Sequence, residues 1–512
     1  MIEALSSSMR GLRFGGLAFL LLGLGGAYVV ANWIVTGTSE DLILRGLAIA
    51  TGVILLLILK NWRSGFYFFL LWLLFEDLAR KYMGNNMLIY FAKDFLVGIV
   101  YVSFFMSLRR HKAEGFHPRF IVPLILFFGF GVIQVFNPGS PNVLFGLLGL
   151  KIYFYYVPLM FVGYALADTE KNLQKFLTVN LSMATVIAVL GVIQAIRGSE
   201  FLNPTILDEN IRGLATLKRY APTSGQFLYR PTSVFVSDGR FASYLILMWL
   251  VGFGAAGYLL LRTKGGRKLT FVSLGAITTA LLLSGSRGGV MWTAGSALIC
   301  ISAFLWGAPW KKRKAHQIIK IIHSTSIVCG LGLIVMISIF PQDIGARLSF
   351  YSETLSPYSP NSELSHRVGG YPIKELLTAF QDPRWPYGYG IGTASLGGQY
   401  VRQWLHITPP TLGVESGFGT LVVELGILGL VLWIVWTVTL LLAAWRVVRR
   451  LKGSPYFPIA FSIFWFAFLL LLLFTYTGMQ AFQNYVLNAY LWLLVGVLFR
   501  LPHLAAQQIP QR

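Results

Sequence analysis

The sequence contains few acidic residues, few cysteines and few charged residues of any kind. Of its 512 residues, 20 are Asp or Glu, two are Cys, and 12% are charged. Because Cys300 and Cys329 both lie within apolar segments, neither a disulfide framework nor a Cys-x-x-Cys metal site is available. The sequence also lacks a His-Glu-x-x-His motif, an Asp-x-Asp motif and any acidic ligand cluster. We therefore expect no tightly bound metal ion.

Apolar residues dominate the composition. Hydrophobic residues make up 55% of the chain, and the mean hydropathy is +0.66, which is more apolar surface than the core of a soluble domain can bury. In a soluble protein, a formal net charge of +22 would suggest binding to nucleic acid. Here the Lys and Arg residues form short clusters between apolar runs, which is typical of membrane topology and not of a nucleic-acid partner. The composition therefore predicts an all-α polytopic membrane protein, surrounded by membrane lipids.

The apolar runs give the expected number of membrane spans. Because a hydrocarbon core of about 30 Å needs roughly 20 apolar residues per helix, we expect about 12 to 14 transmembrane helices. We recognise no small-residue signal-peptide cleavage site after the first apolar run, so we expect this run to be retained as a helix. The expected spans are 14–35, 42–59, 64–79, 93–108, 120–136, 151–167, 176–196, 240–261, 269–284, 288–307, 318–340, 418–442, 457–476 and 482–499.

Basic residues concentrate in alternate loops between these spans. Since cytoplasmic loops carry an excess of Lys and Arg, this alternation predicts that both termini are cytoplasmic. It also predicts that two long loops, at 197–239 and 341–417, are extracytoplasmic. The second loop is rich in proline, so we expect few long helices there and a short one near 368–380. We find no internal repeat, and the simplest organisation is one membrane domain over 1–512.

Several arginines lie on the expected outer side, where the positive-inside rule does not favour them. Arg287 lies between two apolar runs, and a guanidinium group there either extends to the lipid headgroups or meets an anion. Arg230, Arg240, Arg367 and Arg402 lie in or beside the outer loops. A guanidinium group binds phosphate oxygens with two parallel hydrogen bonds. Each of these arginines alone is typical of a solvated loop charge, but together they would bind a diphosphate.

Three residues of the second outer loop are candidates for a general base. Glu415 stands just before an apolar run, where a carboxylate either acts on a substrate hydroxyl or simply stabilises the start of a helix. His366 and His406 are alternatives, because imidazole titrates near neutral pH. Both are also compatible with solvated loop residues.

Further charged residues lie at the expected outer ends of other helices. Lys151 opens its helix from the outer side and has no evident partner in the sequence. Asp77 and Arg80 are three residues apart on one expected helix, so we expect them to form an ion pair. The remaining charges of this region are Glu76, Lys93 and Asp94.

Five short motifs follow one another between residues 230 and 429. They are Arg230-Pro231-Thr232-Ser233-Val234-Phe235 with Ala242-Ser243-Tyr244-Leu245, Leu283-Ser284-Gly285-Ser286-Arg287-Gly288-Gly289, His366-Arg367, Gly388 to Gly392, and Glu424-Leu425-Gly426-Ile427-Leu428-Gly429. In order and spacing, residues 210–440 resemble the O-antigen ligase and O-antigen polymerase superfamily.

The resemblance implies a membrane glycosyltransferase of the bacterial inner membrane. Such an enzyme moves a glycan from undecaprenyl diphosphate to a glycan or lipid acceptor on the extracytoplasmic face, without a metal ion. The family's arginines match Arg287, Arg230 and Arg367. Ligases of the family have a His-Asn pair where this chain has Glu415-Ser416. The resemblance is therefore compatible with a ligase that uses a carboxylate, with a polymerase, or with an exopolysaccharide enzyme.

Three alternative functions make demands that this sequence meets less well than those of a glycosyltransferase. The glycines from Gly388 to Gly392 resemble a nucleotide-binding fingerprint but lack a preceding strand and a βαβ unit, so no nucleotide cofactor is expected. A polysaccharide or lipid-linked glycan transporter or flippase would also need many helices and an anion-binding cavity, but its charges should lie near mid-membrane in related halves. A non-catalytic scaffold would not need guanidinium groups at the bilayer edge.

Overall fold

The computed structural model describes most of the chain. The described residues are 52, 55–84, 87–111, 116–203, 209–220, 225, 227–262, 266–309, 338, 341–356, 370–395, 398, 401–402, 405–407 and 413–507. The expected spans 14–35 and 318–340 lie almost entirely outside these residues, as do much of the span 42–59 and the residue Cys329. The chain divides into two compact units, one made of Met1–Phe68 with Leu96–Arg110 and the other of Phe69–Phe95 with His111–Arg512.

Helices make up nearly all of the regular structure that is described. Up to residue 283, the described helices are α3 (Trp62–Met83), α4 (Met87–His111), α5 (Ile121–Gln134), α6 (Val143–Phe154), α7 (Leu159–Leu166), α8 (Glu170–Arg197), α9 (Glu209–Ala215), α10 (Asp238–Leu261) and α11 (Arg267–Leu283). After residue 283, they are α12 (Arg287–Gly307), α14 (Pro341–Leu355), α15 (Tyr371–Gln381), α17 (Gly417–Arg450), α18 (Phe457–Phe468), the π-helix η2 (Leu469–Phe474), α19 (Thr475–Thr477), α20 (Gln480–Gln483) and α21 (Tyr485–Ala506). Strands β1 (Lys218–Tyr220) and β2 (Phe227–Tyr229) form an antiparallel hairpin.

The prediction of an all-α polytopic membrane protein is confirmed. Within the described part of the chain, eight helical segments are long and apolar enough to cross a membrane. They are Leu88–Arg109, Val143–Leu166, Glu170–Arg197, Asp238–Leu261, Arg287–Gly307, Gly417–Arg450, Phe457–Thr477 and Tyr485–Ala506. The expected spans 120–136 and 269–284 correspond to the shorter helices α5 and α11.

Several of these helices expose large apolar side chains on one face. In α5, Val122 and Ile133 are 61% and 68% exposed, and in α12 both Leu298 and Leu305 are 70% exposed. A soluble protein rarely leaves such rows of apolar side chains in water. Since lipid tails solvate them without cost, these faces are suited to contact with the bilayer.

In the larger unit, α10 lies at the centre of the helix packing. It contacts α8, α11, α12 and α18, and 83% of its most apolar segment is buried, against 28% for α12. Nearby, α7 and α21 cross at two glycines. A side chain at Gly163 would overlap the carbonyl of Leu493, and one at Gly496 would overlap the carbonyl of Met160. Small residues therefore allow this close approach of the two backbones.

In the smaller unit, the beginning of α3 packs against the second half of α4. The ring of Trp62 meets that of Phe104 edge to face, with 5.1 Å between the centroids. The Ser103 hydroxyl donates to the carbonyls of Ile58 and Leu59 at 2.9 and 3.1 Å.

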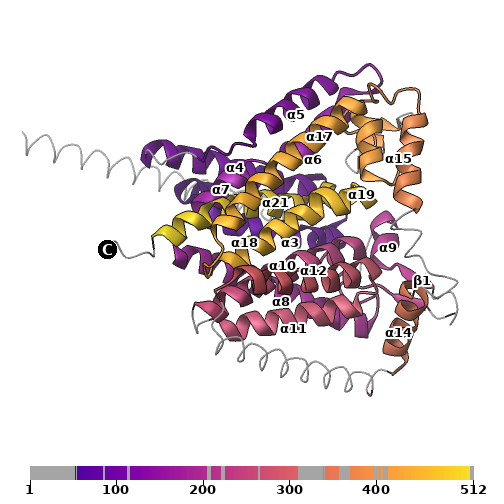
Figure 1. Ribbon diagram of the computed structural model, residues 1–512. Helices are drawn as coiled ribbons and strands as arrows, with labels where there is room; N and C mark the ends of the chain where they lie inside the picture. Colours follow the sequence, from indigo (N-terminus) through magenta and orange to yellow (C-terminus); the bar gives the residue numbers. More distant parts are fainter. Residues whose placement is uncertain are drawn as a thin grey trace, which may run out of the picture. The chain divides into compact units, whose positions relative to one another are not determined.

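The described parts of the segments 197–239 and 341–417 lie at the same end of the helices of the larger unit. Arg347, from the second loop, donates to the carbonyl of Leu283 at the end of α11 and to that of Tyr229 in the first loop. Figure 1 shows α9, β1, α14 and α15 at this end. At the other end of α10, Arg262 pairs with Glu170 at the start of α8, with Nε–Oε1 at 2.6 Å. We call the end of the helices that carries α9, β1, α14 and α15 the loop end (Figure 1).

The loop segments at this end contain more helix than the proline content suggests. The expected short helix near 368–380 is present as α15. The 15-residue helix α14 was not predicted from the sequence. It packs against β2 and α12, so tertiary contacts stabilise it in a segment that composition alone identifies as a loop.

A break in α17 also lies near the loop end. Gly426 has φ of 69° and ψ of −173°, which interrupts the helix. The backbone amides of Tyr389 and Gly390 donate to the carbonyls of Val423 and Glu424 at 2.8 and 2.9 Å. These bonds satisfy carbonyls that the break leaves without helical partners. The break therefore docks the Gly388–Gly392 segment onto α17.

Candidate functional site

Two of the arginines selected from the sequence, Arg230 and Arg287, are brought together at the loop end. Arg230 directly follows β2, and Arg287 is the first residue of α12, whose N-cap hydroxyl on Ser286 accepts from Gly289. A Cβ atom placed on Gly285 would lie 3.3 Å from Cγ of Arg230. The turn before α12 therefore packs directly against the stem of Arg230. At position 285, φ is +65°, a conformation that glycine adopts without strain.

Arg230 pairs with a carboxylate and lies near two other arginines. Its Nη1 lies 2.7 Å from Oδ2 of Asp238, and its side chain is 14% exposed. Burial lowers the pKa of Arg230, Asp238 offsets this effect, and repulsion from Arg219 and Arg287 lowers the pKa further. The guanidinium group of Arg287 also lies over the ring of Phe350, 5.2 Å from its centroid. We call Arg219, Arg230 and Arg287 the arginine cluster.

Helix α14 holds the hairpin and the turn before α12 in place. The Tyr351 hydroxyl donates to the carbonyl of Leu282 at 3.0 Å, and burial raises its pKa, so the hydroxyl stays protonated. Arg347 is buried and bridges the same turn to β2. Leu228 of β2 packs with Phe350 of α14. The positions of Arg230 and Arg287 therefore depend on α14.

A second group of charges, the buried ion network, lies where α3, α4, α6, α10 and α21 meet. Asp77 is fully buried and accepts from Arg80 at 3.1 Å and from Arg240 at 2.9 Å. The predicted pair of Asp77 with Arg80 is confirmed. Arg240, selected from the sequence as a phosphate ligand, is thus engaged by a carboxylate, and its guanidinium carbon lies 5.1 Å from the centroid of the Tyr485 ring.

Lys151 belongs to the same network. Its Nζ lies 2.5 Å from Oδ2 of Asp94 and 4.5 Å from the centroid of the Tyr90 ring, so the structure supplies the partner that the sequence did not reveal. Close by, Lys93 pairs with Glu76 at 2.9 Å. At formal charge, the network has two more cations than anions. Its members are Glu76, Asp77, Arg80, Lys81, Lys93, Asp94, Lys151 and Arg240.

The network also anchors the segment that carries Arg230. The amide of Val236 donates to Oδ2 of Asp77 at 3.3 Å. The buried ammonium group of Lys81 donates to Oγ1 of Thr232 at 2.8 Å and to the carbonyl of Ser233 at 2.7 Å. From α8, Oε1 of Gln194 accepts from the amides of Thr232 and Ser233. These contacts stabilise the backbone between the arginine cluster and α10.

Glu424 has a structural role at the break in α17. It is fully buried, accepts from the Tyr153 hydroxyl at 2.8 Å and accepts from the amide of Ala394 at 3.0 Å. Arg402 donates to the carbonyl of Thr393 in the same loop at 3.1 Å. Glycines in the preceding segment allow close packing, since a Cβ on Gly392 would overlap the carbonyl of Phe145. The Gly388–Gly392 motif is therefore a packing element.

The candidate bases lie elsewhere in the second loop. Glu415 is exposed, and its backbone amide donates to Oε2 of Glu375 on α15 at 3.3 Å. His406 is exposed and has φ of 54°. His366 and Arg367 lie outside the described residues. No contact that we observe joins Glu415 or His406 to the arginine cluster.

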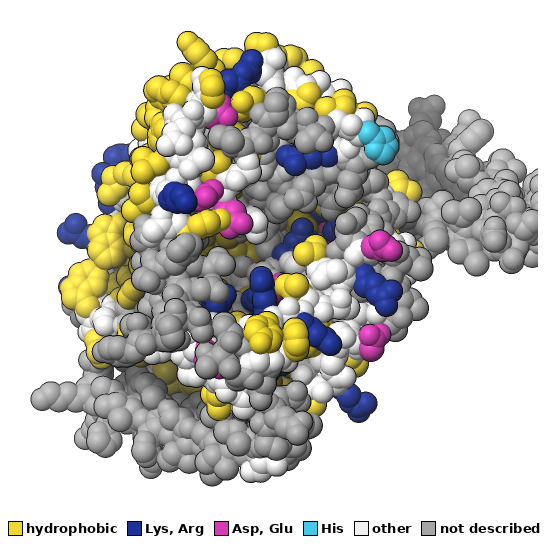
Figure 2. All heavy atoms as spheres, turned by 90° about the vertical axis from the view of Figure 1, so that its right-hand side faces the viewer, with side chains coloured by type: hydrophobic (Ala, Val, Ile, Leu, Met, Phe, Trp, Pro, Cys, Tyr) yellow, Lys and Arg dark blue, Asp and Glu magenta, His cyan; other side chains and the backbone are white. Residues whose placement is uncertain are grey.

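Figure 2 shows the face of the molecule that carries α9, β1, α14 and α15. A hollow lies near the centre of this face, and Lys and Arg side chains gather in it. Among the described residues, no group of three or more His, Cys, Asp or Glu side chains is placed to hold a metal ion. A hollow with basic walls is suited to an anionic ligand.

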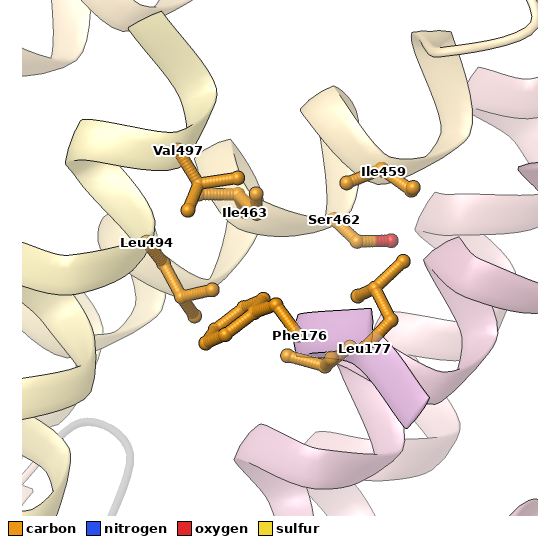
Figure 3. Close-up of a pocket in the computed structure, with 8 residues that line it drawn as sticks. Phe176, Leu177, Ile459, Ser462, Ile463, Leu494 and Val497 are labelled. Carbon is orange, nitrogen blue, oxygen red and sulfur yellow. The ribbon is translucent and has the colours of Figure 1, made fainter. Parts of the chain in front are cut away.

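A small cavity between helices in the larger unit differs in character (Figure 3). Its walls come from α8, α10, α18 and α21, and Ser462 is its single polar lining side chain. An anion would find no charged partner there. The apolar lining instead resembles a packing gap within the helix bundle.

Sequence reasoning did not select Lys81, Arg219 or Arg347. Lys81 stands in a run of other charges, whereas Arg219 and Arg347 stand in the two long loops, in which few long helices were expected. Lys81 and Arg347 donate to a hydroxyl and to backbone carbonyls far away in the sequence. The one local signal was the unusual number of cations on the expected outer side.

The chain matches none of the protein-family models and none of the curated proteins with which it was compared. Fold and site define the class as an all-α, multi-pass membrane protein with a basic hollow at one end of its helices.

Proposed function

We propose that the protein is a membrane glycosyltransferase that transfers a glycan from undecaprenyl diphosphate to a glycan or lipid acceptor. The proposal places it in the bacterial inner membrane, with both termini in the cytoplasm and the loop end outside. The observation that carries it is the proximity of Arg230 and Arg287, which lie 57 positions apart in the sequence. Both belong to the motifs that resemble the O-antigen ligase and polymerase superfamily.

The arginine cluster suits the chemistry of the leaving group. The acceptor hydroxyl attacks the anomeric carbon, and the bond from this carbon to the diphosphate oxygen breaks. Negative charge then grows on the diphosphate, and guanidinium groups already held in place stabilise that charge in the transition state. Arg230 and Arg287 are held by the turn at Gly285 and by α14, so little reorganisation is needed.

A base must accept the proton of the acceptor hydroxyl, and we assign this role to Glu415, with His366 and His406 as alternatives. Glu415 stands at the start of α17, directly beside its N-cap Ser416. Its exposed carboxylate is accessible to an acceptor that arrives from the loop end.

Glu415→Gln should reduce glycan transfer by about 10² while leaving the fold and the binding of the lipid-linked donor unchanged, because the amide cannot accept the proton. Transfer of a labelled glycan and donor affinity should be measured on the same purified sample. Glu375→Gln is a matched control, since Glu375 is the neighbouring carboxylate on α15. Full transfer activity in Glu415→Gln would move the role to His366 or His406.

A transporter of lipid-linked glycans is the second candidate. The helix break at Gly426 and the π-helix η2 favour it, because discontinuous helices are common at transporter binding sites. In this chain, however, carbonyls freed by the break are bonded by the segment 385–390. They are therefore not directed toward a substrate.

Transfer in detergent separates the two functions. Without a sealed membrane a transporter has no task, whereas a glycosyltransferase should convert a cognate lipid-linked donor and acceptor to product. Product formation by the purified protein supports the proposal. Absence of product, together with movement of the lipid across sealed vesicles, would show that the transporter assignment is correct.

A further inference from the structure

Helix α15 carries apolar and polar side chains on separate stripes of its exposed surface. Ile373 and Leu377, one turn apart, are 50% and 57% exposed. Because residues four apart share a helix face, they form one apolar stripe. Lys374 and Thr378 form a polar stripe beside it, in which Lys374 is exposed and Thr378 is half-buried. The remaining side of the helix packs against α17, so α15 is amphipathic on the surface that it leaves open.

Aromatic side chains extend the apolar surface beyond the end of α15. Trp385 and Tyr387 follow the helix and are 38% and 76% exposed. The Trp385 ring meets that of Phe380 on α15 edge to face, with 5.7 Å between the centroids. Tryptophan and tyrosine are enriched where a membrane meets water, because their rings are apolar and carry a polar group. Such rings beside an apolar stripe are typical of a helix in the headgroup layer.

Hydrogen bonds connect this aromatic segment to two helices with exposed apolar faces. The carbonyl of Trp385 accepts from the amide of Ile427 at 3.1 Å, next to the exposed Leu428 of α17. The carbonyl of Tyr387 accepts from the side-chain amide of Gln134 at 3.1 Å, at the end of α5. The exposed surface of α15 and its aromatic segment therefore continues into the faces that are suited to contact with the bilayer.

The length of α17 places a membrane boundary at the same point. Arg446 is the first basic residue of α17 and lies nineteen positions after Ile427, with no charged residue between them. At a rise of 1.5 Å per residue, this stretch is about 29 Å long, close to a hydrocarbon thickness of about 30 Å. The exposed large apolar side chains of α17 also begin at Leu428. Trp385, which bonds to Ile427, therefore lies at the edge of the stretch that fits the hydrocarbon core.

The direction of α15 fits this position. Figure 1 shows α15 at the loop end, where it runs across the direction of α10 and α12. Both of these helices are long and apolar enough to cross a membrane. A helix that runs across them at the boundary lies along the membrane surface and not through the bilayer.

We propose that α15, together with Trp385 and Tyr387, is an interfacial anchor that lies in the headgroup layer on the loop-end side of the membrane. Its partner is the lipid surface: the stripe of Ile373 and Leu377 enters the boundary between headgroups and acyl chains, and the polar stripe faces the water. The anchor fixes the height of the loop end, so that the basic hollow opens beside the lipid headgroups. The inference names no substrate and is independent of the proposed function.

Single cysteines on the two stripes test the anchor. Ile373→Cys and Leu377→Cys probe the apolar stripe, and Thr378→Cys is the matched control on the polar stripe. Each is made in the full-length chain with Cys300→Ala and Cys329→Ala. The purified variants are labelled with a small environment-sensitive fluorophore and reconstituted into vesicles of phosphatidylethanolamine and phosphatidylglycerol. Size-exclusion chromatography verifies the fold, and the two apolar-stripe probes are independent of each other.

A lipid with a nitroxide just below its headgroup should quench the labels at 373 and 377 about twofold or more above the label at 378, because the apolar side of an interfacial helix lies at the boundary of the acyl chains. Iodide, a quencher that stays in water, should quench the three labels in the opposite order.

Equal quenching of all three labels by iodide, without quenching by the lipid, would place α15 in water and overturn the anchor. Protection of 373 and 377 from both quenchers would overturn it as well, because a protein surface would then cover the stripe. The measurement contains no glycan donor. If the protein transfers no glycan but the lipid quenches the apolar stripe selectively, the anchor stands and the proposed function fails. If transfer is observed without this selectivity, the proposed function stands and the anchor fails.

Discussion

Arg287→Lys should lower glycan transfer by about 10² or more, although it preserves the positive charge. Lysine loses the planar fork that binds two phosphate oxygens at once, and the stabilisation of a leaving diphosphate depends on that geometry. Transfer should be measured in detergent with a labelled lipid-linked donor, alongside size-exclusion chromatography to verify the fold.

Arg449→Lys is the matched control, since Arg449 is exposed near the far end of α17. It should retain the transfer rate of the wild type. If Arg287→Lys also retains that rate, the Arg287 side chain only extends toward the lipid headgroups, and the diphosphate clamp must be abandoned.

Asp77→Ala should be the most destabilising single change at the loop end. The carboxylate of Asp77 is fully buried and pairs with both Arg80 and Arg240, so its removal leaves the buried Arg80 and the partly buried Arg240 without their shared anion. Removing one partner of a buried ion pair costs about 3 to 5 kcal/mol. The amide of Val236 also loses its acceptor, which loosens the segment that carries Arg230. The midpoint of thermal unfolding in detergent should fall, and diphosphate binding should weaken with it.

Glu170→Ala provides the comparison at the other end of α10. Glu170 pairs with Arg262, but these side chains are 26% and 31% exposed, so the loss should be about 1 kcal/mol or less. If the two variants shift the unfolding midpoint equally, the buried ion pairs of Asp77 stabilise the protein no more than the exposed pair of Glu170. The buried ion network would then not be what anchors the loop end.

The Asp77→Ala test does not need the enzyme assignment to be correct, because its readout is stability. It tests how the segment from Arg230 to Arg240 is held, whereas Arg287→Lys tests what Arg287 does in glycan transfer. A protein that loses stability in Asp77→Ala but keeps full transfer in Arg287→Lys would have the architecture described here without a diphosphate clamp at Arg287.

The membrane class, most helices and the alternation of their ends could be predicted from the sequence. These properties depend on local composition. An apolar run of about 20 residues crosses a bilayer wherever it stands, and Lys and Arg mark the cytoplasmic loops one by one. The pair of Asp77 with Arg80 is equally local, because residues three apart on a helix are neighbours. The end shared by the two long loops follows from counting spans.

The partners within the candidate site were decided by the tertiary structure. Lys151 finds Asp94, Lys81 finds Thr232, and Glu424 finds Tyr153, and none of these pairs has a spacing that a helix or strand would impose. Whether a buried charge meets a carboxylate or another cation depends on how helices distant in sequence pack. The sequence therefore determined that this protein is a helical membrane protein whose Lys and Arg residues cluster between apolar runs. Helix packing, together with the small hairpin and α14, decided that Arg240 and Lys151 pair with Asp77 and Asp94, and that Arg230 pairs with Asp238 near Arg287.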